Sequence, residues 1–142
     1  MKELVVIYWS GTGNTESMAN AVAEGAKIDD VNVKLMNVSE AKVEDIENAD
    51  AVALGCPSMG AEQLEESEME PFVDSISSAI KGKKLVLFGS YGWGNGEWME
   101  DWEERMTGYG ANIVDDCLII NNTPDDEGIE KCKELGETLA KA

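Results

Sequence analysis

Residues 3–16 read ELVVIYWSGTGNTE, and this stretch joins an apolar run, a glycine-containing turn and the start of a helical pattern. Leu4–Trp9 is short and rich in β-branched residues, which is typical of a strand buried on both faces. The turn SGTGNT follows at once, and Met18, Val22 and Ala26 then recur at helical spacing. The stretch therefore predicts a strand–turn–helix unit of an α/β protein.

The turn at residues 10–15 has the composition of an anion-binding loop without a cation. Gly11 and Gly13 let backbone N–H groups turn toward an anion, and neighbouring hydroxyl and amide groups add neutral donors. The N-terminus of the next helix adds partial positive charge. The turn is neither GxxxxGK[ST] nor GxGxxG, because Glu16 stands where a third glycine would be. We expect a phosphate here, with a purely structural turn as the alternative.

The rest of the chain repeats the alternation of strand and helix. Apolar residues recur at helical spacing from Met18, Met69, Trp98 and Ile129, which predicts four helices. A further short helix is expected at Val43–Asn48. Pro71 suits a first helical turn, and Asp125 or Asp126 suits an N-cap. The further predicted strands are Val31–Met36 at an edge, Ala51–Gly55, Leu85–Gly89 and Ile113–Ile120. Residues 1–142 are thus expected to form one doubly wound α/β domain, with a five-stranded parallel sheet and helices on both faces.

Three strand ends are followed by unusual loops. They are SGTGNT, then GCPSMGAEQ at residues 55–63, and then GSYGWGNGEW at residues 89–98. Parallel strands bring such loops to one edge of the sheet, where ligands bind in doubly wound folds. Met59 and Trp93 are large residues beside glycines that expose them, which favours a flat aromatic ligand between a thioether and an indole. The alternative is that Trp93 folds down to cap the core.

Composition excludes several function classes. The chain has 11 Lys and Arg against 29 Asp and Glu, and its formal net charge is −18. This negative charge disfavours nucleic acid and anionic membranes as binding partners, and it favours a basic protein partner. The absence of histidine removes histidine-dependent triads and most zinc sites, so no metal is expected. Exposed acidic residues at 62–70 and 101–104 are expected either to be solvated helix faces or to form a docking rim.

The three cysteines are Cys56, Cys117 and Cys132, and they are widely spaced without a CxxC motif. This pattern predicts reduced, mostly buried thiols in a cytoplasmic protein. The first apolar run is too short for a signal peptide, and we expect no membrane-spanning segment.

Four stretches together resemble flavodoxin, specifically the short-chain clostridial kind. They are VIYWSGTGNTE, LGCPSMGAEQLEESEMEPF, LFGSYGWGNGEWM and NTPD, and the resemblance covers nearly the whole chain. It implies the strand order 2-1-3-4-5 with FMN at the switch point between the first and third strands. The last strand, expected to run uninterrupted over Asn112–Ile120, leaves no room for the insertion of long-chain members.

The resemblance also implies a role for each loop. Residues 10–15 would hold the FMN phosphate, Met59 and Trp93 would cover the two ring faces, and Ser58 and Ser90 would line the ribityl chain. Gly60 would present its carbonyl to flavin N5, Glu62 would accept from N3–H, and Gly92 N–H would approach the pyrimidine edge. Ala61 departs from relatives that have a polar residue after the glycine. The full expected contact set is Ser10, Gly11, Thr12, Gly13, Asn14, Thr15, Ser58, Met59, Gly60, Ala61, Glu62, Ser90, Tyr91, Gly92, Trp93, Gly94 and Asn122.

The function implied is that of a low-potential one-electron carrier rather than an enzyme. It would cycle mainly between semiquinone and hydroquinone, as a monomer that serves redox enzymes with basic docking surfaces in a ferredoxin-like role. Rotation of the Gly60 peptide would favour the semiquinone, and nearby negative charge would resist the second electron. Three alternatives are a phosphoacceptor receiver domain, a flavin enzyme such as a quinone reductase, and a non-redox binding module. The receiver is disfavoured because the strand ends lack its acidic residues and lysine.

Overall fold

The structure, a computed structural model, describes residues 2–11, 13–59, 63–92 and 94–142. Its parallel sheet has the order β2-β1-β3-β4-β5, and β6 also pairs with β4. This is the order that the resemblance to flavodoxin implies, and both this order and the doubly wound fold class are confirmed. The strands are β1 (Lys2–Tyr8), β2 (Val31–Asn37), β3 (Ala51–Gly55), β4 (Lys84–Tyr91), β5 (Asn112–Ile113) and β6 (Leu118–Asn121).

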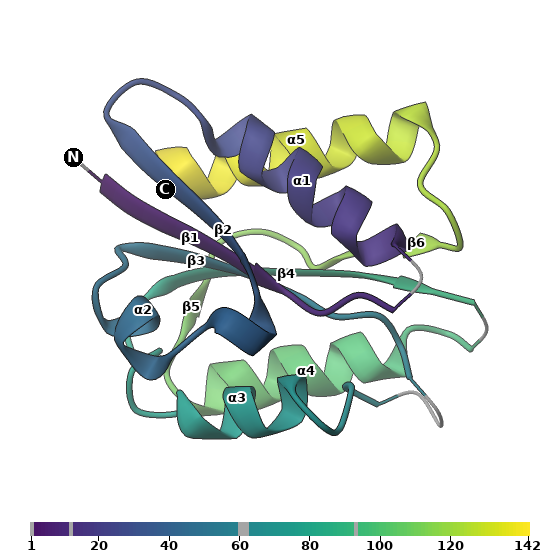
Figure 1. Ribbon diagram of the computed structural model, residues 1–142, viewed down its shortest axis with the longest axis horizontal. Helices are drawn as coiled ribbons and strands as arrows, with labels where there is room; N and C mark the ends of the chain where they lie inside the picture. The colour runs from purple at the N-terminus through teal and green to yellow at the C-terminus, as the bar shows by residue number, and fades with distance from the viewer. Residues whose placement is uncertain (1, 12, 60–62, 93) are drawn as a thin grey trace.

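Helices cover both faces of the sheet, as Figure 1 shows. One face carries α1 (Asn14–Ala26) and α5 (Asp126–Lys141), and the other carries α2 (Val43–Glu47), α3 (Met69–Ser75) and α4 (Glu97–Gly108). A 3₁₀ turn, η1 (Val38–Glu40), follows β2. No helix in the described ranges combines the length and apolarity needed to cross a bilayer.

The fifth strand position is filled by two short strands rather than one. β5 pairs with the start of β4 and β6 with its end, and residues 114–117 lie between them. The prediction of an uninterrupted strand over Asn112–Ile120 is therefore wrong. In a strand, the adjacent Asp115 and Asp116 would point to opposite faces of the sheet, and helices cover both of these faces. Burial of an unpaired carboxylate is costly, and the break leaves both side chains exposed.

Two other elements differ in length from the prediction. β4 continues to Tyr91, so residues 90–91, which were predicted as loop, belong to the strand. α3 ends at Ser75, although Ile76 and Ile80 beyond it are fully buried and continue the apolar spacing. The Ser75 hydroxyl donates to the Phe72 carbonyl at 2.7 Å, a bond that competes with helix continuation. Other details are confirmed, including Pro71 in the first turn of α3 and Asp125 as the α5 N-cap.

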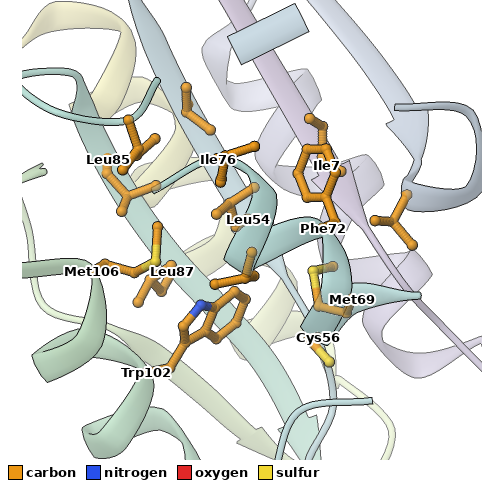
Figure 2. Close-up of a cluster of buried hydrophobic side chains, with 14 of the residues drawn as sticks. Ile7, Leu54, Cys56, Met69, Phe72, Ile76, Leu85, Leu87, Trp102 and Met106 are labelled. Carbon is orange, nitrogen blue, oxygen red and sulfur yellow. The ribbon is translucent and has the colours of Figure 1, made fainter. Parts of the chain in front are cut away.

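Each face of the sheet has its own buried core. The core under α3 and α4 includes Trp98, Trp102 and Met106, and part of it is drawn in Figure 2. The core under α1 and α5 includes Met18 and Leu139. These two layers fix the strands, so the loops at the carboxyl ends of β1, β3 and β4 start from rigid positions.

Two glycines bring α1 and α5 into backbone contact. A Cβ atom added to Gly25 would lie 1.9 Å from the Lys133 carbonyl oxygen, and one added to Gly136 would lie 2.0 Å from the Val22 carbonyl oxygen. No larger side chain fits at either position without moving a helix. Glycine is therefore required here by close approach of the helices rather than by its backbone angles.

Candidate functional site

A cavity of about 270 Å³ lies at the carboxyl edge of the sheet, where the loops after β1, β3 and β4 and the end of β6 converge. The chain leaves β1, β3 and β4 on the right-hand side of Figure 1. The residues that line the cavity are Trp9, Gly11, Asn14, Pro57, Ser58, Met59, Ser90, Tyr91, Gly92 and Asn122. None of these lining residues has a charged side chain, so the described wall offers neutral hydrogen-bonding groups and apolar surface.

The loop after β1 presents an open helix N-terminus. The Ser10 hydroxyl oxygen accepts from the Gly13 N–H at 3.1 Å, which closes the turn on itself. Gly13 is the N-cap of α1 with φ of 96°, a conformation that favours glycine, and no side chain caps the helix. The first N–H groups of α1 therefore have no side-chain cap, and they retain the partial positive charge of a helix start.

The end of β4 connects the other loops to one another. The hydroxyls of Thr15 and Ser90 lie 2.9 Å apart, and both residues are buried. The Ser90 carbonyl accepts from the Ser58 N–H at 3.0 Å, and the Tyr91 carbonyl accepts from the Asn122 N–H at 2.7 Å. Residues from four strand ends are thus joined at Ser90 and Tyr91 by hydrogen bonds.

The structure brings most of the described predicted site residues together. Eight of them line the cavity: Gly11, Asn14, Ser58, Met59, Ser90, Tyr91, Gly92 and Asn122. Ser10 and Gly13 shape the turn, Thr15 lies behind Ser90, and Gly94 follows in the same loop with φ of 88°. The predictions for Thr12, Gly60, Ala61, Glu62 and Trp93 fall on residues outside the described ranges.

Trp9 and Pro57 also line the cavity, although the sequence pattern did not single them out. Trp9 ends the first apolar run, and strand alternation gave no reason to separate it from the core. The available signal was its position directly before the turn, because the residue that follows a buried strand lies at the ligand edge of the sheet.

Two acidic residues expected on the exposed surface are engaged elsewhere. Glu65 is only 4% exposed, and its carboxylate accepts from the Ser67 N–H and hydroxyl and from the Glu68 N–H. Glu70 forms a two-pronged ion pair with Arg105, at 2.7 and 2.6 Å. The prediction that Glu65 lies on a solvated face is wrong, because three local donors replace water around its carboxylate.

The carboxylate of Glu16, next to the turn at residues 10–15, is also held in place. The Tyr8 hydroxyl donates to Glu16 Oε2 at 3.0 Å. Burial raises the pKa of the Tyr8 hydroxyl, and the hydrogen bond to Glu16 raises it further. The hydroxyl therefore keeps its proton and remains a donor to Glu16 at neutral pH.

The donors around the cavity fit a phosphate monoester that carries an aromatic group. The uncapped helix start suits the phosphate. The Trp9, Met59 and Tyr91 side chains supply apolar and aromatic wall for a ring system. These features define the class of doubly wound α/β proteins that bind a ligand at the switch point between β1 and β3.

Comparison with known proteins identifies the family. The family model described as Flavodoxin matches residues 6–136. The chain is 51% identical to a flavodoxin of Clostridium beijerinckii over 95% of this chain and 97% of that protein. It is 46% identical to a flavodoxin of Megasphaera elsdenii over 96% and 98%, respectively. The solution structure of two-electron reduced Megasphaera elsdenii flavodoxin matches with a TM-score of 0.89 at 45% identity, covering 98% of this chain and 99% of that one.

The chain belongs to the flavodoxin family, as a short-chain member. It is therefore an FMN-binding electron carrier rather than an enzyme that turns over its own substrate. The resemblance drawn from the sequence is confirmed.

Proposed function

We propose that this chain, acting as one domain, carries single electrons at low potential and cycles mainly between FMN semiquinone and hydroquinone. The observation that carries the proposal is that no described residue of the cavity wall is charged, within a chain of net charge −18. Because the described residues of the wall include no cation, they provide little compensation for a second negative charge beside the phosphate. Two unit charges about 4 Å apart repel by about 4 kcal/mol at an effective dielectric constant of 20. Addition of the second electron is therefore disfavoured relative to the first.

The phosphate end of the cofactor is assigned to residues 10–15. The uncapped start of α1 and the turn closed by Ser10 and Gly13 support this assignment. The hydroxyl of Ser10 and the amide of Asn14 add neutral donors, and Thr12 and Thr15 complete the set. Such a site binds a dianion through dipoles alone, because the aligned N–H groups of a helix start replace a cation.

The ring end is assigned to the loops after β3 and β4. Met59 supports one ring face from the cavity wall, and Trp93 is proposed for the other face. Tyr91 and Gly92 line the same wall, and Ser58 and Ser90 are proposed along the ribityl chain. Glu62 and Ala61 are proposed to complete the contacts to the edge of the ring. Gly94 and Asn122 are proposed to contact the cofactor from the neighbouring loops.

The Gly60 peptide is proposed to control the first reduction step. A carbonyl that turns toward flavin N5 accepts a hydrogen bond from the N–H formed there on reduction. Such a hydrogen bond contributes about 0.5–1.5 kcal/mol. The Met59 and Gln63 backbones exchange two hydrogen bonds, at 2.9 and 3.0 Å, and so fix the base of the turn. Replacement of Gly60 by Val is expected to lower the first midpoint potential. Gly82→Val is the control, because it places the same side chain at a glycine that does not line the cavity and has φ of 77°.

Spectroelectrochemical titration of the FMN-loaded protein tests the proposal. A blue intermediate over a wide range of potential, followed by bleaching at low potential, is the expected result. A single two-electron transition without a blue species would contradict it. Colourless protein that takes up no added FMN would contradict cofactor binding itself.

The proposed partners are redox enzymes with basic docking surfaces. Glu66 and Glu68 are exposed after the Met59 loop, and Asp101 and Glu104 are exposed on α4. Opposite charge speeds the encounter of such partners, and salt screens it beyond about 8–10 Å. Electron-transfer rates to a basic partner are expected to fall steeply with ionic strength. Rates that do not change with ionic strength would contradict docking through these acidic residues.

A cytoplasmic, monomeric protein is also proposed, consistent with free thiols at Cys56, Cys117 and Cys132.

A further inference from the structure

Cys56 lies at the point where β3 ends and the Met59 loop begins. Its side chain is fully buried, and the sulfur takes part in two contacts. The Glu65 N–H donates to Cys56 Sγ at 3.4 Å, and the Cys56 thiol donates to the Pro57 carbonyl at 3.4 Å. Because Pro57 and Glu65 stand at the two ends of residues 57–65, one sulfur atom contacts both ends of the loop.

The backbone of Cys56 is fixed by two hydrogen bonds. Its N–H donates to the Phe88 carbonyl at 3.1 Å, and its carbonyl accepts from Trp98 Nε1 at 3.2 Å. A Cβ on Gly89 would lie 2.1 Å from the same carbonyl oxygen, so glycine there permits this close approach. Figure 2 places Cys56 in the packed cluster with Met69 and Phe72. The sulfur is thus held against a rigid part of the protein.

The far end of the loop is also secured. The Glu65 carboxylate is buried and accepts from the Ser67 and Glu68 N–H groups, at 2.9 and 2.7 Å. Between the two ends, Met59 and Gln63 form the antiparallel bridge at the base of the turn. Met59 lines the cavity, so a displacement of either end would move a wall residue.

We propose that Cys56 is a positioning residue that closes the Met59 loop against the cavity, and that it thereby sets the ring-side affinity for FMN and the midpoint potentials. The inference rests on the proposed placement of the flavin ring beside Met59. A thiol suits this position because it is compact, apolar enough for burial, and both a weak donor and a weak acceptor. Burial raises the pKa of Cys56 to about 12, so the thiol keeps the proton that it donates to Pro57.

Four variants test the inference. Cys56→Ala removes both sulfur contacts, Cys56→Ser keeps a donor and an acceptor, and Cys56→Val removes the contacts while filling the volume. Cys132→Ala is the matched control, because Cys132 is equally buried but lies in the core under α1 and α5. Each apoprotein is titrated with FMN and with riboflavin, and both midpoint potentials of the FMN-loaded form are measured.

Cys56→Ala is expected to weaken FMN and riboflavin binding by the same factor, between about threefold and tenfold, because the two weak sulfur contacts together are worth about one ordinary hydrogen bond. Equal factors are expected because the phosphate loop is untouched. Cys56→Ser should recover most of the affinity, and Cys132→Ala should leave both affinities and both potentials unchanged. If Cys56→Ala does not fold, Cys56→Val is expected to show the same loss.

Unchanged affinities and potentials in Cys56→Ala or Cys56→Val would overturn the inference. So would a loss confined to FMN, which would place the effect at the phosphate, and so would an equal loss in Cys132→Ala. These outcomes differ from failure of the proposed function, in which the unaltered protein itself binds neither FMN nor riboflavin.

Discussion

The side-chain hydroxyls of Thr15 and Ser90 lie 2.9 Å apart, although the residues are 75 positions apart in the chain. Thr15 is at the start of α1 and Ser90 is near the end of β4, so the bond joins the turn after β1 to the loop after β4. The Ser90 N–H also approaches the Thr15 hydroxyl oxygen, at 3.4 Å. The proposed phosphate and ring ends of the site are therefore linked through buried atoms.

Thr15→Val is expected to destabilise the apoprotein by about 1–2 kcal/mol, because it leaves the Ser90 hydroxyl buried without its partner. FMN affinity should fall as well, since the two loops lose their connection. Urea unfolding and FMN titration measure the two effects. Thr107→Val on the exposed surface of α4 is the control, and its effect should stay within about 0.5 kcal/mol. Equal stability of the two variants would contradict this role of the Thr15 hydroxyl.

Ser10→Ala is expected to weaken FMN binding by about tenfold, because the turn loses the acceptor for the Gly13 N–H and the phosphate loses a donor. Riboflavin, which lacks the phosphate, should bind with unchanged affinity. Fluorescence titration with both ligands makes the comparison. Ser17→Ala is the matched control, because that hydroxyl also contacts Gly13 but is exposed on α1. An equal loss of riboflavin affinity would rule out a phosphate-specific effect.

Gly136→Ala is expected to destabilise the protein by about 2–3 kcal/mol or more, because its Cβ would meet the Val22 carbonyl oxygen at 2.0 Å. Urea unfolding of the apoprotein gives the free energy. Gly108→Ala at the end of α4 is the control, since nothing lies within 4 Å of its added Cβ. That change should be neutral or slightly stabilising, because alanine favours helix by up to about 1 kcal/mol over glycine. A neutral Gly136→Ala would mean that the helices separate readily.

Alkaline pH is expected to destabilise the fold through its buried acids. Burial raises the pKa of the Cys132 thiol from 9.0 to about 12, so the unfolded chain releases this proton first. The stabilisation is complete below pH of about 9 and is lost as pH rises toward about 12, at about 1.4 kcal/mol per pH unit. Tyr8, whose pKa is also raised, acts in the same direction above its ordinary value of 10.0. Cys132→Ala should flatten the unfolding free energy against pH. Parallel curves for the two proteins would contradict the assignment.

The alternation of strands and helices and the converging loops were predictable, because both follow from local patterns in the sequence, whereas the strand order was implied only by the resemblance to flavodoxin. Apolar runs such as Ala51–Gly55 mark buried strands, and SGTGNT marks a helix start that can receive an anion. The break at residues 114–117 was not predicted, because six of the eight residues in IVDDCLII are apolar and the two aspartates were treated as part of the run. Their adjacency was the available signal.

The roles of Trp98 and Cys56 could not be read from the sequence. Trp98 belongs to a helical apolar stripe and is buried as that stripe predicts, but its Nε1–H donates to a carbonyl 42 positions earlier. Likewise, a buried cysteine at a strand end gives no indication that its sulfur meets an amide nine positions later. Hydrogen bonds across such distances depend on packing, and spacing patterns carry no information about them.

The glycine contact between α1 and α5 also affects how the protein is made. In the order of synthesis α1 precedes the other helices of this domain, and α5 follows them. Until then, the apolar side of α1 and the sheet face beside it lack the helix that covers them. Partly made chains with exposed apolar surface associate readily, so this stage of synthesis is the one at which a chaperone has a surface to bind. Because the contact joins α1 to α5, closure of this layer must await the synthesis of α5.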